Sequence, residues 1–152
     1  MNENVGVASD INGRALQDHL VAELGLKDLT AQIGPDRPYP SVAEAAIEIL
    51  RAGQVDRLVL ICGTGIGMSI TANKFPGVRA ALVSDVYSAQ RASRSNDANV
   101  LCLGSQTIGA SVAPILVREW LEGSLDMARS GSKVELVAAI EQRVMAGAEG
   151  RS

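Results

Sequence analysis

One unbroken apolar run, residues 58–62, constrains the fold of this chain more than any other feature. A strand with one face in water alternates apolar and polar side chains, whereas a strand inside a parallel sheet is covered on both faces and is apolar throughout. The run follows Arg57 and stops at Gly63, so it has the length of a strand and not that of a helix. It therefore predicts the central strand of a parallel sheet.

Shorter apolar runs alternate with helical patterns along the rest of the chain. Strands are predicted at residues 5–8, 78–82 and 99–103, and helices over 13–24, from 41 through 50, and from about 85 and 108. Ser41, with Glu44 three residues later, is a good N-cap for the second of these helices. Repeated strand, helix and strand units predict an α/β fold: a doubly wound parallel sheet in a three-layer α/β/α arrangement, with residues 1–152 as a single domain.

A last helix is predicted over about residues 133–145, where Val134, Val137, Ile140 and Val144 recur at helical spacing. The stretch before it, residues 129–132, contains serine and glycine, which predicts a flexible link. A helix joined in this way packs either on its own domain or on a partner subunit, and the pattern leaves both open.

Composition excludes several classes of partner. The chain has 152 residues, a formal net charge of −3 and no stripe of lysine and arginine, so nucleic acid is not expected. No apolar run is long enough to cross a bilayer, and Glu3 lies where a signal peptide would be basic, so we expect a cytoplasmic protein without a membrane partner. One histidine, His19, and two distant cysteines form no recognisable metal site.

Glycines alternate directly after the central strand, at positions 63, 65 and 67. Such a loop lets backbone amides approach an anion at the start of a helix, although its spacing matches neither the dinucleotide fingerprint nor the P-loop. Cys62 precedes the loop, and a thiol near a helix N-terminus can form a thiolate that takes a proton or attacks a carbonyl. The alternative is that Cys62, like Cys102, is a small buried residue ending a strand. Asp10 follows the first predicted strand and opens onto the same side of the sheet.

Segments 62–70, 72–74, 79–82, 87–89 and 96–104, which begin with Cys-Gly-Thr-Gly-Ile-Gly-Met-Ser-Ile and end with Asn-Asp-Ala-Asn-Val-Leu-Cys-Leu-Gly, together resemble one family. It is the ribose-5-phosphate isomerase B family, which includes the galactose-6-phosphate isomerases, and the resemblance extends from residue 5 to about 144. The resemblance implies a Rossmann-like fold and an aldose–ketose isomerase of sugar phosphates that works through a cis-enediolate without metal or cofactor. It also implies a homodimer or a dimer of dimers with shared sites, acting in carbohydrate metabolism such as the pentose phosphate pathway.

The same resemblance implies roles for individual residues. Cys62 would move a proton between C1 and C2 of the sugar, and Thr64 would orient the thiolate by a hydrogen bond. Asp10 would hold sugar hydroxyls, and Asn96 would stabilise the enediolate oxygen together with the amides of the glycine loop. The other expected substrate contacts are Ser9, Tyr39, Gly63, Gly65, Gly67, Ser95, Arg129 and Lys133.

Departures from the family pattern concentrate on substrate recognition. Ile11 and Ser95 stand where the family has histidines, and Gln106 stands where it has an arginine. Of a cluster of cations that binds phosphate, Arg129 and Lys133 remain, with Arg14 or Arg94 as potential substitutes. The family histidine at the position of Ser95 is assigned to opening the sugar ring.

Two substrate classes therefore remain open. Ribose 5-phosphate needs its ring opened, whereas a tetrose 4-phosphate such as erythrose or erythrulose 4-phosphate has the ring-forming oxygen esterified. A different class of function, a non-catalytic sugar-phosphate-binding paralogue or an inactive subunit of a mixed oligomer, is the alternative to an enzyme. A thiol-based transferase or phosphatase is disfavoured, because no arginine follows Cys62 at the spacing of a Cys-x5-Arg loop.

Overall fold

The apolar run at the middle of the chain forms β3 (Arg57–Cys62), the central strand of a five-stranded sheet in this computed structural model, which describes residues 4–151. The other strands are β1 (Val5–Ser9), β2 (Lys27–Asp28), β4 (Ala80–Leu82) and β5 (Val100–Gly104). Their order is β2-β1-β3-β5-β4, and every neighbouring pair is parallel. The predicted doubly wound α/β fold is confirmed.

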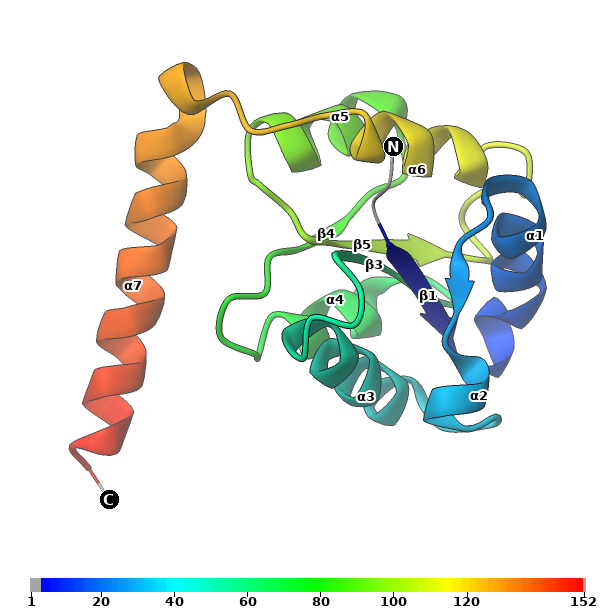
Figure 1. Ribbon diagram of the computed structural model, residues 1–152, viewed down its shortest axis with the longest axis horizontal. Helices are drawn as coiled ribbons and strands as arrows, with labels where there is room; N and C mark the ends of the chain where they lie inside the picture. The colour runs from blue at the N-terminus through cyan, green and yellow to red at the C-terminus, as the bar shows by residue number, and fades with distance from the viewer. Residues whose placement is uncertain (1–3, 152) are drawn as a thin grey trace.

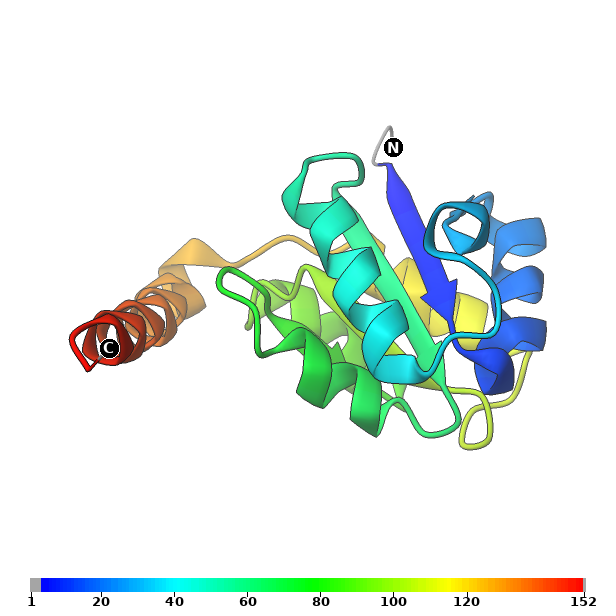
Figure 2. The same ribbon diagram turned by 90° about the horizontal axis from the view of Figure 1, so that it is seen from below.

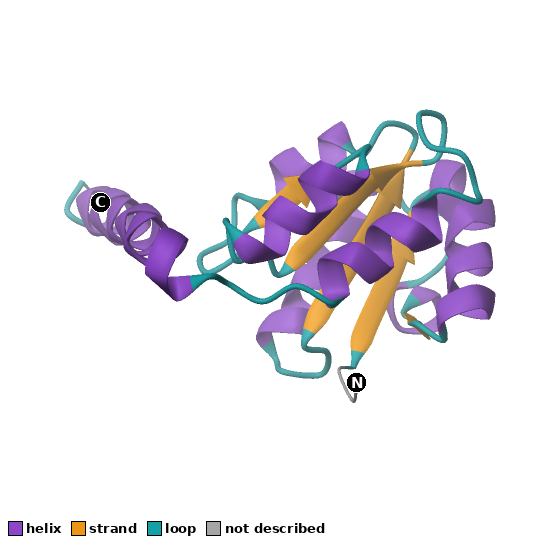
Figure 3. Cartoon of the chain, turned by 90° about the horizontal axis from the view of Figure 1, so that it is seen from above, coloured by secondary structure: helices purple, strands orange, loops and turns teal. Residues whose placement is uncertain are grey.

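Both faces of β3 are buried, as its composition predicts. Val59 and Ile61 pack toward α1 (Arg14–Leu24), α5 (Val86–Arg94) and α6 (Ala113–Leu121). Leu58 and Leu60 pack on the other face, where α2 (Thr30–Ile33), α3 (Tyr39–Arg51) and α4 (Ile66–Ala72) lie. Each fully buried aliphatic side chain of this kind contributes about 1.5–3 kcal/mol to folding. Figure 3 shows the sheet between these two layers of helices.

The course of the chain reverses between β1 and β3, which are adjacent in the sheet. From β1 the chain winds outward to β2, and from β3 it winds in the opposite direction to β4 and β5. Ser9 pairs with Ile61, so β1 and β3 end side by side and release Asp10 and Cys62 at the same edge. A crevice for a ligand is expected at such a reversal.

Proline positions correct two of the predicted helix starts. Helix α3 begins at Tyr39 with Pro38 as its N-cap, so Ser41 is inside the helix and does not cap it. Proline lacks an amide hydrogen and is tolerated in a first turn, which lets Pro40 start the helix early. Helix α6 begins at Ala113, five residues after the predicted start, because Pro114 fits only its first turn. The short elements β2 and α2 were not predicted.

The C-terminal segment differs from the predicted flexible link and helix. Residues Met127–Gly131 form a π-helical turn, η2, that continues without a break into α7 (Ser132–Glu149). No side chain of α7 is buried, and Figure 1 and Figure 2 both show the helix standing off the rest of the molecule. Its exposed apolar side chains are Leu136, Val137, Ile140, Val144 and Met145.

Trp120 on α6 belongs to the core of the protein. It is fully buried, and its indole N–H donates to the carbonyl oxygen of Ala98 at 2.9 Å.

Within residues 4–151, no helix combines the length and apolar character needed to cross a membrane.

Candidate active site

A cavity of about 440 Å³ opens where β1 and β3 end, and we call it the thiol pocket. Its lining residues are Asp10, Asn12, Tyr39, Cys62, Gly63, Thr64, Ile66, Gly67, Ile70 and Gln106. The prediction that Asp10 and Cys62 open onto one side of the molecule is confirmed. Six of the other residues expected to contact the substrate do not line this pocket: Ser9, Gly65, Ser95, Asn96, Arg129 and Lys133.

The thiol of Cys62 is held at the last position of β3, with 5% of the residue exposed. Its Sγ accepts a hydrogen bond from the backbone N–H of Gly65 at 3.1 Å. Gly65 has φ +77°, a left-handed conformation that favours glycine, and it turns the chain into α4. The backbone N–H of Gly65 therefore fixes the position of the sulfur at the start of α4.

Cys102 lies on the neighbouring strand β5, on the same face of the sheet, and is fully buried. Burial raises the pKa of the Cys102 thiol far above its usual range, and the nearby Cys62 adds to the rise. Cys102 is therefore a neutral packing residue, and Cys62 is the thiol that meets the pocket.

Thr64 contacts the helix and not the sulfur. Its hydroxyl oxygen accepts from the N–H of Ile66 at 3.3 Å and so caps the first turn of α4. The hydrogen bond to Sγ that sequence reasoning gives to Thr64 comes from Gly65. Because the amide of Gly65 faces sulfur, the glycine amides that remain for an oxyanion are those of Gly63 and of Gly67, which lies in the first turn of α4, where backbone donors lack helical partners.

Asp10 is held rigidly at the mouth of the thiol pocket. One carboxylate oxygen accepts from the backbone N–H groups of Asn12 at 3.0 Å and Gly13 at 3.2 Å, capping the short 3-10 turn η1 (Ile11–Gly13). The residue is 8% exposed and also lines an adjoining cavity of about 570 Å³ that includes Ile11 and Arg37. This fixed carboxylate can accept hydrogen bonds from hydroxyl groups.

Two other side chains lie against the glycine loop. A Cβ on Gly67 would lie 2.5 Å from the ring of Tyr39, so only glycine lets this ring rest on the first turn of α4. A Cβ on Gly63 would lie 3.5–3.6 Å from the side-chain amide of Gln106, which therefore covers this part of the loop. Tyr39 and Gln106 both line the thiol pocket.

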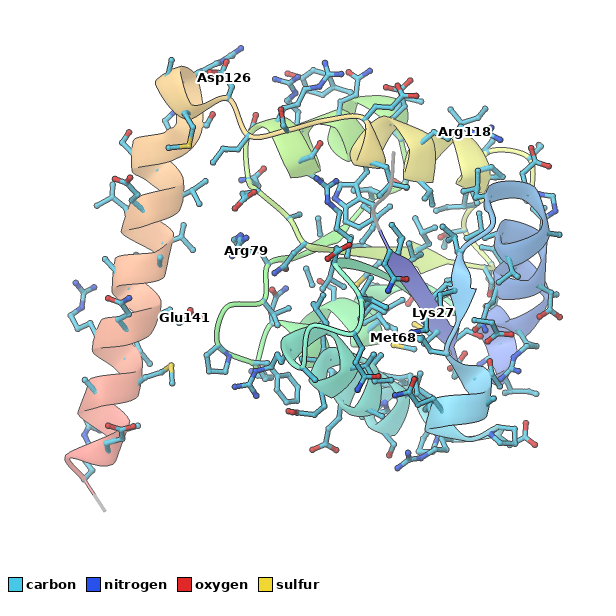
Figure 4. All side chains as sticks on the ribbon, viewed as in Figure 1. Lys27, Met68, Arg79, Arg118, Asp126 and Glu141 are labelled. Carbon is cyan, nitrogen blue, oxygen red and sulfur yellow. The ribbon has the colours of Figure 1, made fainter. Side chains whose placement is uncertain are left out.

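Four predicted substrate residues line a different cavity. Ser95, Asn96, Arg129 and Lys133 border a space of about 650 Å³ between α7 and the body of the molecule, which we call the cation cavity. Figure 4 labels Arg79 on the body and Glu141 on α7, which border the same cavity from its two sides. One chain therefore does not bring these four residues to Cys62.

Ser9 lies outside both cavities. Its hydroxyl donates to the side-chain oxygen of Gln17 on α1 at 2.7 Å, and the residue is buried. Because successive side chains of a strand point to opposite faces, Ser9 faces α1 while the chain turns Asp10 toward the pocket. Arg14 and Arg94, the potential phosphate contacts, line neither the thiol pocket nor the cation cavity.

Among the polar lining residues, Asn12 and Arg91 were given no role by sequence reasoning, and Gln106 was named only as a departure from the family pattern. Asn12 and Gln106 follow the ends of β1 and β5, and loops at the carboxyl ends of parallel strands are where such residues are expected. Arg91 lies four residues before Ser95, a spacing that puts both on one face of a helix. Among residues 4–151, no group of three or more histidine, cysteine, aspartate or glutamate side chains has the arrangement of a metal site.

Comparison with known proteins supplies the chemical class. Residues 5–137 match the family model described as Ribose/Galactose Isomerase. The chain is 48% identical over 105 residues to ribose-5-P isomerase B of Listeria innocua, covering 69% of this chain and 71% of that protein. It is also 48% identical over 104 residues to D-erythrulose-4-phosphate isomerase 2 of Mycolicibacterium smegmatis, covering 68% of each. The structure of the type B ribose 5-phosphate isomerase of Leishmania infantum superposes with a TM-score of 0.86 at 32% identity, over 94% of this chain and 99% of that one.

Proposed function

Because the chain belongs to the ribose/galactose isomerase family and is an aldose–ketose isomerase of a sugar phosphate, we propose that its substrate pair is erythrulose 4-phosphate and erythrose 4-phosphate. The observation that carries this choice is Ser95 in the cation cavity, where no histidine is present among the lining residues. No histidine lines the thiol pocket either, and His19 lies on α1.

The two substrate classes differ in their ring chemistry. Ribose 5-phosphate closes its ring through the 4-hydroxyl, and opening that ring needs a group that moves protons near neutral pH, a role for which histidine is suited. A tetrose 4-phosphate has this oxygen esterified and is already open. The name of the Mycolicibacterium smegmatis relative, an erythrulose-4-phosphate isomerase, supports the same substrate class.

The thiol pocket supplies the proton transfer. Cys62 acts as the base that takes the proton from the hydroxyl-bearing carbon next to the carbonyl, giving a cis-enediolate. The hydroxyl proton then passes between O1 and O2, and the Cys62 thiol returns its proton to the former carbonyl carbon, so that the carbonyl forms on the neighbouring carbon. The amide of Gly65 favours the thiolate through its hydrogen bond to Sγ. Preorganised donors to the developing oxyanion contribute about 3 kcal/mol each to lowering the barrier, and we assign this role to the amides of Gly63 and Gly67 and to Asn96.

A complete site needs two copies of the chain. Asn96, Ser95, Arg129 and Lys133 are in the cation cavity, whereas Cys62, Thr64, Asp10 and Tyr39 are in the thiol pocket. We therefore propose a homodimer, with or without pairing into a dimer of dimers, in which the thiol pocket of each copy meets the cation cavity of the other. The exposed apolar face of α7 would be covered by the second copy.

No metal or cofactor has a role in this proposal, and the cytoplasm is the proposed compartment, since both cysteines are free thiols. The proposed place in metabolism is the handling of short sugar phosphates.

The test is a substrate panel in deuterated water. Purified protein is supplied with erythrulose 4-phosphate, ribose 5-phosphate and galactose 6-phosphate, and both turnover and deuterium uptake at C1 and C2 are measured. We expect the tetrose to give the highest kcat/KM and to take up deuterium through the enediolate. A clear preference for the pentose would overturn the tetrose assignment.

Ser95→His sharpens the same test. A histidine at this position restores a group for ring opening, so kcat/KM for ribose 5-phosphate should rise relative to that for the tetrose. Ser95→Asn is the matched control, since an amide is polar but does not transfer protons at neutral pH. An equal effect of both variants on the two substrates would argue against the ring-opening explanation.

A further inference from the structure

The cation cavity holds more positive charge than the two predicted phosphate contacts provide. Four cations, Arg79, Arg91, Arg129 and Lys133, line it against one carboxylate, Glu141. Arg79 is paired with Asp97 at 2.8 Å, and Glu141 accepts hydrogen bonds from the N–H of Gly77.

The other three cations, Arg91, Arg129 and Lys133, have no ion-pair partner within residues 4–151. Like charges that are gathered in a concave site without counter-ions produce a positive potential that attracts an anion. Arg129 and Lys133 are already expected to contact a bound phosphate group, whereas Arg91 has no assigned role.

The backbone of Arg91 is fixed by hydrogen bonds at the end of α5. It lies on α5 one turn before Ser95, and its carbonyl oxygen accepts from the N–H groups of Ser95 at 2.8 Å and Asn96 at 3.2 Å. The same helix end therefore positions Arg91 and the two predicted substrate residues. Neither the family resemblance nor the departures from it assign a role to this position.

The guanidinium of Arg91 packs on an aromatic ring, and one of its nitrogens, Nε, has no hydrogen-bond partner in the described part of the chain. Its central carbon lies 5.5 Å from the ring centroid of Tyr87, which also lines the cavity. The planar fork of arginine matches the oxygens of a phosphate group, and Arg91 lines the cavity without an ion-pair partner in the described part of the chain.

We propose that Arg91 is a third substrate-binding cation, which contacts the phosphate group of the sugar phosphate beside Arg129 and Lys133, with Tyr87 as the positioning residue that orients its guanidinium. This inference rests on the proposed function, because it assumes that the cation cavity receives the phosphorylated end of the substrate. It adds a residue that compensates for the reduced number of cations in the phosphate-binding cluster.

Kinetics separates binding from a merely structural role. The phosphate keeps its charge throughout the reaction and is remote from the carbons that exchange the proton, so a contact to it stabilises ground state and transition state alike. Loss of such a contact raises KM and leaves kcat nearly unchanged.

The experiment compares Arg91→Gln with the wild-type protein and with Arg118→Gln as a matched control. Arg118 lies on α6, pairs with Glu23 and lines neither cavity. The measurements are kcat and KM for the best substrate of the panel, and the dissociation constant of inorganic phosphate by calorimetry. We expect Arg91→Gln to raise KM and the phosphate dissociation constant by about tenfold or more, to change kcat by less than about twofold, and Arg118→Gln to change none of them.

Further variants and outcomes complete the test. Arg91→Lys keeps the charge but loses the fork, so it should fall between the wild type and Arg91→Gln. Arg91→Met keeps the aliphatic packing and takes the place of the glutamine variant if that variant melts early. Unchanged KM and unchanged phosphate binding in Arg91→Gln or Arg91→Met would overturn the inference, as would a loss confined to kcat. If the wild-type protein turned over no sugar phosphate, the proposed function would fail, and phosphate binding would still decide on Arg91.

Discussion

The thiol pocket and the cation cavity differ in almost every property that matters for catalysis. The thiol pocket has a sulfur, a carboxylate and backbone amides, all fixed at the ends of buried strands, and no lysine or arginine among its lining residues. The cation cavity has three cations, on α5, η2 and α7, that have no ion-pair partner among residues 4–151, and no cysteine lines it. The first can move a proton and the second can hold an anion.

This division has a physical basis. Proton transfer from carbon needs a base and oxyanion donors fixed to within a fraction of an ångström, which a strand end and a glycine loop provide. Phosphate binding needs cationic side chains whose donors reach the phosphate oxygens, and long side chains of arginine and lysine can adjust to them. In the proposed dimer, the two functions lie at separate surfaces of each chain, so activity would depend on the association of two chains.

The largest effect is expected from Cys62→Ser, which removes the base and keeps its size. A serine hydroxyl does not ionise near neutral pH, so we expect kcat to fall by about 10³-fold, the usual contribution of a positioned acid–base group. Deuterium uptake at C1 and C2 should fall in parallel. Cys102→Ala is the control: it should lower the free energy of unfolding by about 1 kcal/mol through a small cavity and leave kcat unchanged. If Cys62→Ser kept full turnover, the thiol would not be the base.

Mixing two impaired variants tests the separation directly, with activity measured at a substrate concentration well below the wild-type KM, where loss of the phosphate contacts also removes turnover. Cys62→Ala spoils the thiol pocket, and Arg129→Ala combined with Lys133→Ala spoils the cation cavity. When the two proteins are unfolded together and refolded, half of the dimers are mixed, and each mixed dimer has one intact site, so activity should recover to about a quarter of the wild-type value. Recovery should be absent when each variant is refolded alone. No recovery in the mixture would indicate that each site is built within a single chain.

A smaller effect is expected from Ile140→Asp on the exposed apolar face of α7. Ile140 is half exposed within one chain, and a carboxylate there would be desolvated in a dimer, so we expect dimer dissociation to become at least about tenfold easier. Analytical ultracentrifugation measures the change, and specific activity at low protein concentration should fall with it. Glu135→Gln, on the same helix, is the control for a change of charge. A wild-type protein that sediments as a fully active monomer would contradict the shared site.

The smallest effect is expected at the edge of the sheet, remote from both cavities. Partial burial raises the pKa of Asp28, but hydrogen bonds from Thr30 and Gln17 and the charge of Arg14 outweigh it, so the net pKa is lowered. A lowered folded-state pKa stabilises the protein above the unfolded value, near 4, and this stabilisation disappears as pH falls through the folded value.

Asp28→Asn should therefore be less stable than the wild type at pH 7, and the difference should shrink as pH falls from about 5 to about 3. Urea unfolding at a series of pH values measures this change. The variant should keep wild-type kcat and KM, because Asp28 lines neither cavity. A difference that stayed constant with pH would mean that the carboxylate charge does not contribute.

Much of the fold was predictable because hydrophobic periodicity is a local property. The unbroken run ending at Cys62 and the alternating strand and helix patterns predict a doubly wound sheet, and the same pattern brings Asp10 to the edge where Cys62 ends. Helix starts at Tyr39 and Ala113 were less predictable, since prolines at Pro40 and Pro114 compete with the capping residues that sequence reasoning favours.

The site was predictable only in part. The glycine spacing and the resemblance identify Cys62 and its loop, but they do not reveal that Gly65, and not Thr64, donates to the sulfur. They also give no sign that Ser9 faces Gln17 or that Arg91 faces the cation cavity. Each of these facts depends on which face of an element is turned toward a neighbour.

The amino-acid sequence by itself determined the chemistry available to this protein: one thiol before a glycine loop, a carboxylate after the first strand, and a reduced set of cations near the C-terminus. Only the tertiary structure decided where these groups meet, and it separated the thiol from the cations. The reason is physical, since residue types and spacing fix local conformation and reactivity, whereas the distance between two groups far apart in the chain depends on how the helices pack on the sheet.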